Sequence, residues 1–501
     1  MTGARRLNVL ASAALACAAL AAPPAALAQA GKTTVTVGLV LEPAPGLDPT
    51  VAAAAAIGEV VHYNVLEGLT KINADGAVTP LLAERWTMDP DGRSYTFTLR
   101  KGVRFHDGEA FDSADVKFSF ERAKAEGSTN KAKKTVFDNI STIATPDAHT
   151  VILMLDKPDG NFPFRMGENT AVILDPKSAA TTATRPVGTG PYRLEDWRKG
   201  SAIVLGKWDG YRDAKSVAIT RATFRIISDP AAQVAALLAG DVDAFPRGIG
   251  NQAVKQLQAD PRFTVALGST AGKGILSINN RKKPFDDVRV RRALAHAIDR
   301  KAFIDGVLEG YAVPIGSHFA PADAGYVDLT GVYPYDPEKA RALLKEAGVA
   351  TPLNVTLTLP PPPYARKGGE VVAAMLAKVG VVAKIENVEW AQWLGGTFKG
   401  NFDLSIINHV EPLDYLQYTN PQYYWGYDSA AFRDLARRHA AATDAKERQK
   451  LFGELQRQLA TDAVNAYLFN PQNVAVSRKA LKGVWVHSPI FANDLAAWRW
   501  Q

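Results

Sequence analysis

The clearest alternation of hydrophobic and polar residues along the chain lies between Ser94 and Arg122. Aromatic and aliphatic residues alternate with threonines over 94–99, which is the period-two pattern of a half-buried strand. A turn follows, and the alternation resumes at 103–105. Asp112 then stands where a helix N-cap is expected, with Asp115 three residues later, as in a capping box. The stretch therefore predicts two short strands and a helix.

Similar patterns elsewhere predict a mixed α/β chain, because strand-like and helix-like segments alternate. Strands are expected at 33–41, 150–155, 192–194, 202–206, 223–227, 241–245, 274–280, 353–359 and 382–387. Helices are expected after Pro49 and over 229–238, 284–298, 335–344, 367–379 and 447–459. Near the C-terminus, residues 467–476 predict a pair of short returning strands.

The N-terminus has the features of a secretory leader. Two arginines precede an apolar run at 7–22, and small residues at 26 and 28 fit a signal-peptidase site. The run is shorter than the ~20 residues needed to span a bilayer, so residues 1–28 are predicted to be a cleaved signal peptide. Cys17 is the only cysteine and lies inside this leader, and the residues before it fit a lipoprotein signal poorly. We therefore expect an exported, soluble mature chain without thiols.

Composition removes several classes of function. A chain of 501 residues predicts roughly two to four domains, and a formal net charge of +7 is too modest to indicate nucleic-acid binding. The basic residues at 281–301 are better explained as a solvated helix face with local ion pairs. The eight histidines are scattered and form no HxxxH pair, so neither a metal site nor a cofactor is expected. No GxSxG motif marks a hydrolase nucleophile, although paired carboxylates remain possible.

Aromatic residues gather between Trp390 and Tyr427, with several polar residues among them. Aromatic walls with a few polar groups are typical of a small-molecule cleft, and rings beside acids suit a cationic or amphipathic ligand. The alternative is that half of these rings belong to the ordinary core. We predict that this region contributes to a ligand pocket.

Four segments carry a resemblance to a known family: YTFTLRKGVRFHDGEAFDSADVKFSFER, VGTGPYRLEDWRKG, KPFDDVRVRRALAHAIDRKAFIDGVL and YDPEKARALLKEAG. In their order and spacing the chain resembles the periplasmic solute-binding proteins of the peptide/nickel ABC-importer family (family 5, cluster C type). The resemblance implies a two-lobed periplasmic-binding-protein fold of class α/β with an additional third domain. It also implies a monomeric periplasmic receptor that encloses a small-molecule or peptide ligand by hinge closure. The receptor would deliver this ligand to an inner-membrane ABC permease, without catalysis.

The resemblance also implies a division of the chain. Domain I is expected to be discontinuous (30–70, 186–272 and 478–501), domain II to span 71–185 and domain III to span 273–477, with the ligand between domains I and III. On this division the stretch from Ser94 to Arg122 lies in domain II, away from the cleft.

The family's ligand chemistry carries over only in part. Related dipeptide binders place an aspartate, which pairs with the ligand's α-amino group, at the position that Asn408 holds here. Their carboxylate-binding arginine is missing from the loop at 359–364, and the next arginine is Arg366. An ammonium buried without a charged partner is costly, so a free dipeptide is disfavoured. Glu411 or Asp414 are alternative sources of negative charge.

Other ligands stay open: a longer peptide, a modified amino acid, an opine or a sugar conjugate. A nickel complex is less favoured, although His409 keeps it possible. An exported hydrolase acting in the same cleft is the rival function, and a chaperone-like or signalling receptor is a third. The candidate ligand-binding residues are Arg366, Trp390, Trp393, Asn408, His409, Glu411, Asp414 and Tyr423.

Overall fold

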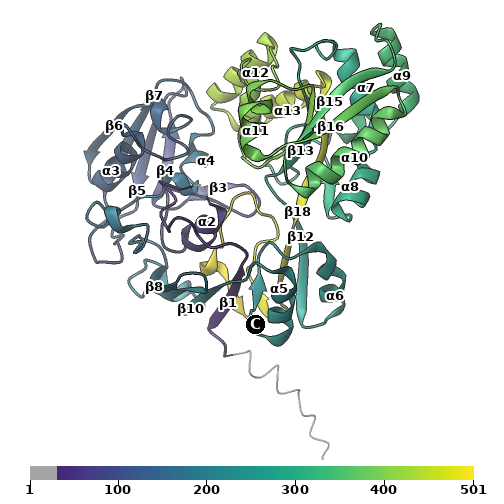
Figure 1. Ribbon diagram of the computed structural model, residues 1–501. Coiled ribbons are helices and arrows are strands. Elements are labelled where there is room, and N and C mark those ends of the chain that lie inside the picture. Colours follow the sequence, from purple (N-terminus) through teal and green to yellow (C-terminus); the bar gives the residue numbers. More distant parts are fainter. Residues whose placement is uncertain (1–30, 53) are drawn as a thin grey trace, which may run out of the picture.

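The computed structural model describes residues 31–52 and 54–501. The predicted signal peptide and Cys17 lie outside the described residues. The chain forms two lobes joined by extended strands (Figure 1). The first lobe contains the helices and strands before residue 270 together with the C-terminal segment, and the second contains those between residues 273 and 461. Within the described part of the chain, no helix has the length and hydrophobicity to cross a membrane.

One mixed sheet runs through both lobes, and β18 is its central strand. Its strands, in order, are β16 (Val381–Asn387), β15 (Leu353–Leu359), β17 (Leu404–His409), β13 (Lys273–Ile278), β18 (Ala466–Arg478), β11 (Ala244–Phe245), β1 (Thr34–Leu39), β10 (Arg221–Ile226), β9 (Ala202–Lys207) and β8 (Tyr192–Arg198). Two further strands pair with β18, namely β12 (Phe263–Ser269) and β14 (Ala312–Pro314).

Helices cover the sheet in each lobe (Figure 1). In the first lobe they are α2 (Ala55–Val61), α5 (Pro230–Ala239) and α6 (Val254–Ala259). In the second they are α7 (Val288–Ala297), α8 (Arg300–Leu308), α9 (Pro337–Glu346), α10 (Pro363–Ala377), α11 (Trp390–Gly395), α12 (Ala430–Ala441) and α13 (Ala445–Thr461). Two short ribbons complete the first lobe: β2 (Thr70–Ile72) with β3 (Val78–Pro80), and β19 (Leu481–Lys482) with β20 (Arg499–Trp500).

The stretch from Ser94 to Arg122 forms part of a separate four-stranded sheet in the first lobe. The strands are β4 (Ala83–Met88), β5 (Ser94–Leu99), β7 (Thr150–Leu155) and β6 (Ile140–Asp147), and the helices beside them are α3 (Ser113–Lys124) and α4 (Phe162–Arg165). Asp112 caps α3, and its own N–H donates to Asp115, which confirms the predicted capping box. Residues 103–105 form no strand of the described structure, only an isolated bridge from Arg104 to Ala110, so that expectation was wrong.

The expectation of two short strands at 467–476 was also wrong, because β18 is one continuous strand. Its first half pairs with β13 and β14 of the second lobe, and its second half, from Gln472 to Arg478, pairs with β12 of the first. Pro471, which has no N–H to donate, marks the point where the partner strands change. The strand therefore belongs to both lobes.

The lobes also touch through side chains away from β18. The side-chain amide of Asn161, just before α4, donates to Tyr415 Oη (3.0 Å) and accepts from Arg448 Nη2 of α13 (3.0 Å). Gly160 lies so close to Arg448 and to the carbonyl of Ala440 that an added Cβ would collide with both. This contact joins the four-stranded part of the first lobe to the corner between α12 and α13.

Candidate ligand-binding site

Much of the aromatic segment lies in the hydrophobic core of the second lobe. Trp393 is only 3% exposed, and its Nε1 donates to Ser405 Oγ (3.0 Å). Trp390, at the start of α11, is 42% exposed, and Tyr423 is half-buried. The other buried rings of this segment are Phe402, Tyr415, Tyr418, Tyr424, Trp425 and Tyr427. The ordinary-core alternative therefore describes most of these rings, and Trp390 and Tyr423 are the predicted site residues that keep exposed ring surface.

Asp414 lies at the centre of a buried polar cluster. Its Oδ2 accepts hydrogen bonds from His318 Nε2 (3.0 Å) and faces His409 Nδ1 at 3.2 Å, while Lys273 Nζ lies 2.9 Å from Oδ1. Lys273 also donates to the backbone carbonyl of Glu411 (2.6 Å). All four charged or ionisable side chains of the cluster are buried. The register of the sheet explains part of this arrangement, because Lys273 of β13 lies directly opposite His409 of β17.

Two tyrosines complete this cluster. An ionised carboxylate only accepts, so the imidazole nitrogens that face Asp414 carry the hydrogens and the opposite nitrogens accept. Tyr418 Oη lies 3.0 Å from His318 Nδ1, and Tyr424 Oη lies 2.9 Å from His409 Nε2. We name Lys273, His318, His409, Asp414, Tyr418 and Tyr424 the Asp414 network. Every ring nitrogen in it has a partner.

The charges in the Asp414 network follow from its burial. Burial lowers the pKa of His318 to about 4, and the nearby Asp414 carboxylate only partly opposes this effect. Burial alone would raise the pKa of Asp414, but His318 and Lys273 together hold it well below its usual range. At neutral pH His318 is therefore neutral and Asp414 is ionised, and the Asp414 carboxylate contacts Lys273 directly through Oδ1.

The side chains of His318, His409 and Asp414 could in principle hold a metal, since one donor atom from each lies within 4.8 Å of the others. The donor set fits a metal poorly, because the Lys273 ammonium already lies against the same carboxylate and both outer imidazole nitrogens face tyrosine hydroxyls. Sequence reasoning missed this cluster, since Lys273 and His318 lie far from Asp414 along the chain. A lysine at the start of the strand at 273–278, which is mostly apolar, was the one available signal.

Asn408, the penultimate residue of β17, has an unpaired side-chain oxygen and so differs from the residues of the neighbouring Asp414 network. Its N–H donates to Tyr364 Oη (3.1 Å), but its buried Oδ1 has no hydrogen-bond partner among the described residues. Gly272 lies against this oxygen, and Pro471 lies against Gly272: a Cβ added to Gly272 would lie 2.9 Å from Asn408 Oδ1 and 2.7 Å from Pro471 Cγ. Asn408 is therefore next to the point where β18 passes between the lobes. The Glu411 side chain, three residues on, is exposed.

Arg366 occupies the first turn of α10, which begins at Pro363, earlier than the expected residue 367. Proline suits this position because its fixed φ matches a helix start. Arg366 Nη2 lies 3.0 Å from Glu389 Oε1, immediately before Trp390, and the side chain is part-exposed. The arginine is thus engaged by a glutamate at the surface of the second lobe.

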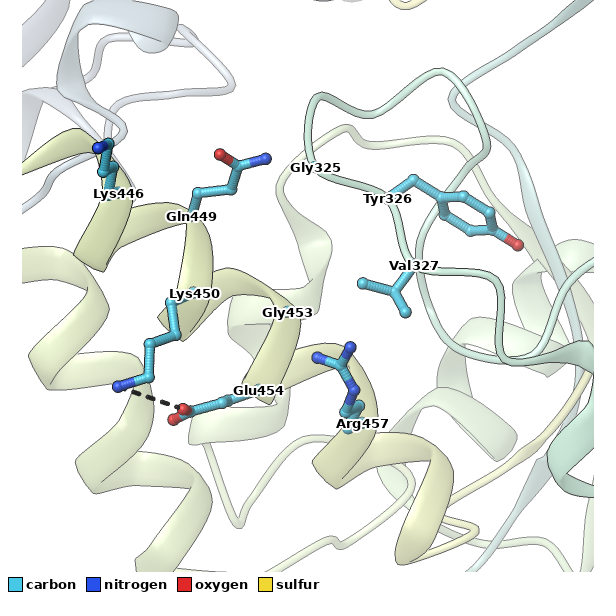
Figure 2. A pocket seen from close by; sticks show the side chains of 9 residues that line it. All are labelled: Gly325, Tyr326, Val327, Lys446, Gln449, Lys450, Gly453, Glu454 and Arg457. Carbon is cyan, nitrogen blue, oxygen red and sulfur yellow. Dashed lines mark ion pairs between the residues drawn. The ribbon is translucent and has the colours of Figure 1, made fainter.

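A surface hollow of about 480 Å³ lies elsewhere on the second lobe, between α13 and the segment Gly325–Val327 (Figure 2). Its charged side chains lie along α13, where Lys450 faces Glu454 at 3.9 Å. None of the eight predicted site residues lines it. The hollow and the region around Asn408 are therefore two separate places on the lobe.

Comparison with known proteins identifies the family. The model of the family described as bacterial extracellular solute-binding proteins, family 5 Middle, matches residues 77–431. The dipeptide-binding protein of Escherichia coli (strain K12) is 35% identical over 348 residues, which is 63% of this chain and 64% of that protein. The alignment thus spans slightly less than two thirds of that relative.

Solved structures show the same fold over nearly the whole chain. The structure of HbpA2 from Haemophilus parasuis overlays with a TM-score of 0.84 and 24% identity, covering 93% of this chain and 100% of that one. The periplasmic binding protein DppA from Helicobacter pylori, in complex with the peptide STSA, overlays with a TM-score of 0.74 and 26% identity, covering 93% and 98%. The resemblance drawn from the four sequence segments is thereby confirmed: the chain belongs to the bacterial extracellular solute-binding proteins of family 5 and has a two-lobed α/β fold.

Proposed function

We propose that this chain is the extracytoplasmic substrate-binding protein of an ABC importer. It captures a peptide or similar small solute between its lobes and delivers it to a membrane permease. Family membership supports this proposal, as do the relatives, one named for dipeptides and one solved with a bound peptide. Export through a cleaved leader at 1–28, a periplasmic location and a monomeric state belong to the proposal.

The main support for a binding site between the lobes comes from the pairing of β18. One strand forms ladders with both lobes and changes partners at Pro471, next to the unpartnered oxygen of Asn408. Hinge closure about such connecting strands would bring both lobes onto a solute lying there. We keep the division into domain I (30–70, 186–272 and 478–501), domain II (71–185) and domain III (273–477), with β18 shared between the first and the last.

The predicted site residues then divide into two roles. We infer that Arg366, Trp390, Asn408, Glu411 and Tyr423, whose side chains are part-exposed or exposed, contact the solute. Trp393, His409 and Asp414 are buried in the second lobe, and we infer that they support the residues that contact the solute. Asn408 supplies a neutral oxygen where related dipeptide binders have a carboxylate, so the negative charge for a ligand ammonium comes from the exposed Glu411.

Native mass spectrometry of the freshly purified protein tests this function. We expect the mature chain to appear as a monomer with an additional small mass, which gentle activation releases intact. Calorimetry with the released solute is then expected to show saturable 1:1 binding without product. A protein that retains no solute and binds no member of a peptide library contradicts the proposal, and chemical conversion of the solute would favour a hydrolase.

A further inference from the structure

Arg247 is a second buried polar residue with unmet hydrogen-bonding capacity, in the first lobe. It follows β11, and only 11% of its side chain is exposed. Nη2 donates to the carbonyl of Ala492 (2.9 Å), but the buried Nε and Nη1 have no hydrogen-bond partner within residues 31–52 and 54–501. A buried guanidinium with two unused donors is costly, and such groups in native structures call for a partner.

The acidic residue closest to Arg247 does not meet this need. Glu59 of α2 lies 3.8 Å from Nη1, too far for a hydrogen bond. Burial raises the pKa of Glu59, against the opposing effect of Arg247, so burial favours the neutral acid at this position. Arg247 cannot lose its own charge in this way. The positive charge of Arg247 is therefore only partly balanced.

Arg247 lies beside the same strand as Asn408. Asn473 of β18 donates through Nδ2 to the carbonyl of Pro246 (2.9 Å), which holds the loop that carries Arg247. Asn473 follows two residues after Pro471, and Pro471 and Asn408 both lie beside Gly272. Residues two apart in a strand point to the same side, about 7 Å from each other. The two residues with unmet hydrogen-bonding capacity thus approach one face of β18, one from each lobe.

The cover over Arg247 is an aromatic ring. The Phe491 ring lies 5.7 Å from the guanidinium carbon, in cation–π distance, and is 44% exposed. Figure 1 shows this C-terminal segment in yellow, on the side of the first lobe that faces the second. Rotation of an exposed ring is a small movement, and it would open the guanidinium to a solute.

We propose that Arg247 is an anion-binding residue of the first lobe that takes the carboxylate of a solute held beside β18. The inference rests on the proposed function and names its ligand class: solutes with a free carboxylate, such as peptides with an unmodified C-terminus. A planar guanidinium suits a carboxylate because two N–H groups donate in parallel. This residue would supply the positive charge that the loop at 359–364 of the second lobe lacks.

The test uses a library of two- to five-residue peptides, each present as the free acid and as the C-terminal amide. Native mass spectrometry identifies the members that wild-type protein binds, and calorimetry measures their affinities. We expect free acids to bind and their amides to bind more weakly. Arg247→Gln is expected to weaken binding of the acids roughly 10- to 100-fold, the range of a lost charge-assisted hydrogen bond, and to leave the amides unchanged. Arg225→Gln, which alters an exposed arginine of β10 in the same lobe, is the matched control.

Arg247→Lys provides a second variant should Arg247→Gln fold poorly. A lysine keeps the positive charge but lacks the two parallel N–H groups, so we expect weaker binding of the acids with their preference over the amides retained, whereas a merely structural role predicts equal changes for acids and amides. Equal binding of acids and amides by wild-type protein, or equal losses for both in Arg247→Gln, would overturn the inference and leave the proposed function standing. If wild-type protein binds no member and retains no solute of its own, the proposed function fails and this inference fails with it.

Discussion

Two buried polar regions flank the crossing strand, and they differ in how completely their groups are paired. In the Asp414 network, Lys273, both imidazoles and both tyrosines have a partner within the lobe, and Asp414 Oδ1, which makes no hydrogen bond, forms an ion pair with Lys273 Nζ at 2.9 Å. At Asn408 and Arg247, an amide oxygen and two guanidinium nitrogens meet none among the described residues. The residues Asn408 and Arg247 are part-exposed, but their unpaired atoms are buried, so solvent exposure of these atoms does not explain the difference.

The difference assigns separate tasks to the two regions. A fully paired buried network specifies one arrangement of the residues around it, because any change leaves a polar group stranded. An unpaired group lowers stability until a partner binds. We therefore interpret the Asp414 network as a rigid support for β17. Asn408 and Arg247 are instead groups whose unpaired atoms bind the solute. Variants in the Asp414 network should therefore act first on stability, and variants at Asn408 or Arg247 first on affinity for the solute.

Breaking the support should give the largest effect. Asp414→Ala leaves the Lys273 ammonium buried without its counter-charge, and we expect a loss of about 3–5 kcal/mol in the free energy of unfolding. Chemical denaturation monitored by tryptophan fluorescence measures this loss. Asp428→Ala, which removes an exposed acid paired with Arg433 in the same lobe, is the control and should change stability by less than about 1 kcal/mol. Equal stability of the two variants would show that the network does not support the lobe.

Acid should weaken the same network by a smaller amount. Because burial lowers the pKa of His318 to about 4, below its ordinary value, the unfolded chain binds this proton more readily than the folded one. The contribution of His318 to the free energy of unfolding is then fully present above about pH 6.5. It declines as the pH falls toward 4, by at most about 1.4 kcal/mol per pH unit. Thermal unfolding at pH 7.5 and 5 measures the decline. His318→Asn should reduce the slope, and an unchanged slope would contradict this origin.

Removing an unpaired group should have the smallest effect on stability. Asn408→Ala loses no side-chain hydrogen bond from Oδ1, so the free energy of unfolding should change by about 0.5 kcal/mol or less. Affinity for the retained solute should nevertheless fall about 5- to 10-fold, the value of one neutral hydrogen bond. Asn401→Ala, an exposed asparagine just before β17, is the control. A large loss of stability with unchanged affinity would place Asn408 with the support instead.

Local patterns predicted much of the fold, because alternation and capping act over a few residues. β5, α3 and the Asp112 cap lie where the sequence indicates. The continuity of β18 could not be predicted, since Pro471 is a break signal locally and its cost is met by a change of partner strands. The Asp414 network could not be predicted either, because His318 and Asp414 are 96 residues apart and only the packing of the lobe brings them together.

The site could be predicted as a region more readily than as a set of side chains. Aromatic density between Trp390 and Tyr427 marked the right lobe, but it does not distinguish a core ring such as Trp393 from an exposed one such as Trp390. Arg247 lies in the other lobe and in no motif, so only its unpaired nitrogens draw attention to it.

Hydrogen exchange of the protein with its retained solute, against the same protein after the solute is removed, tests the central claim most directly. The account predicts that the solute slows amide exchange in both lobes beside β18, at 246–250, 406–411 and 486–492. Protection confined to the outer hollow, at 325–327 and 446–457, would contradict it.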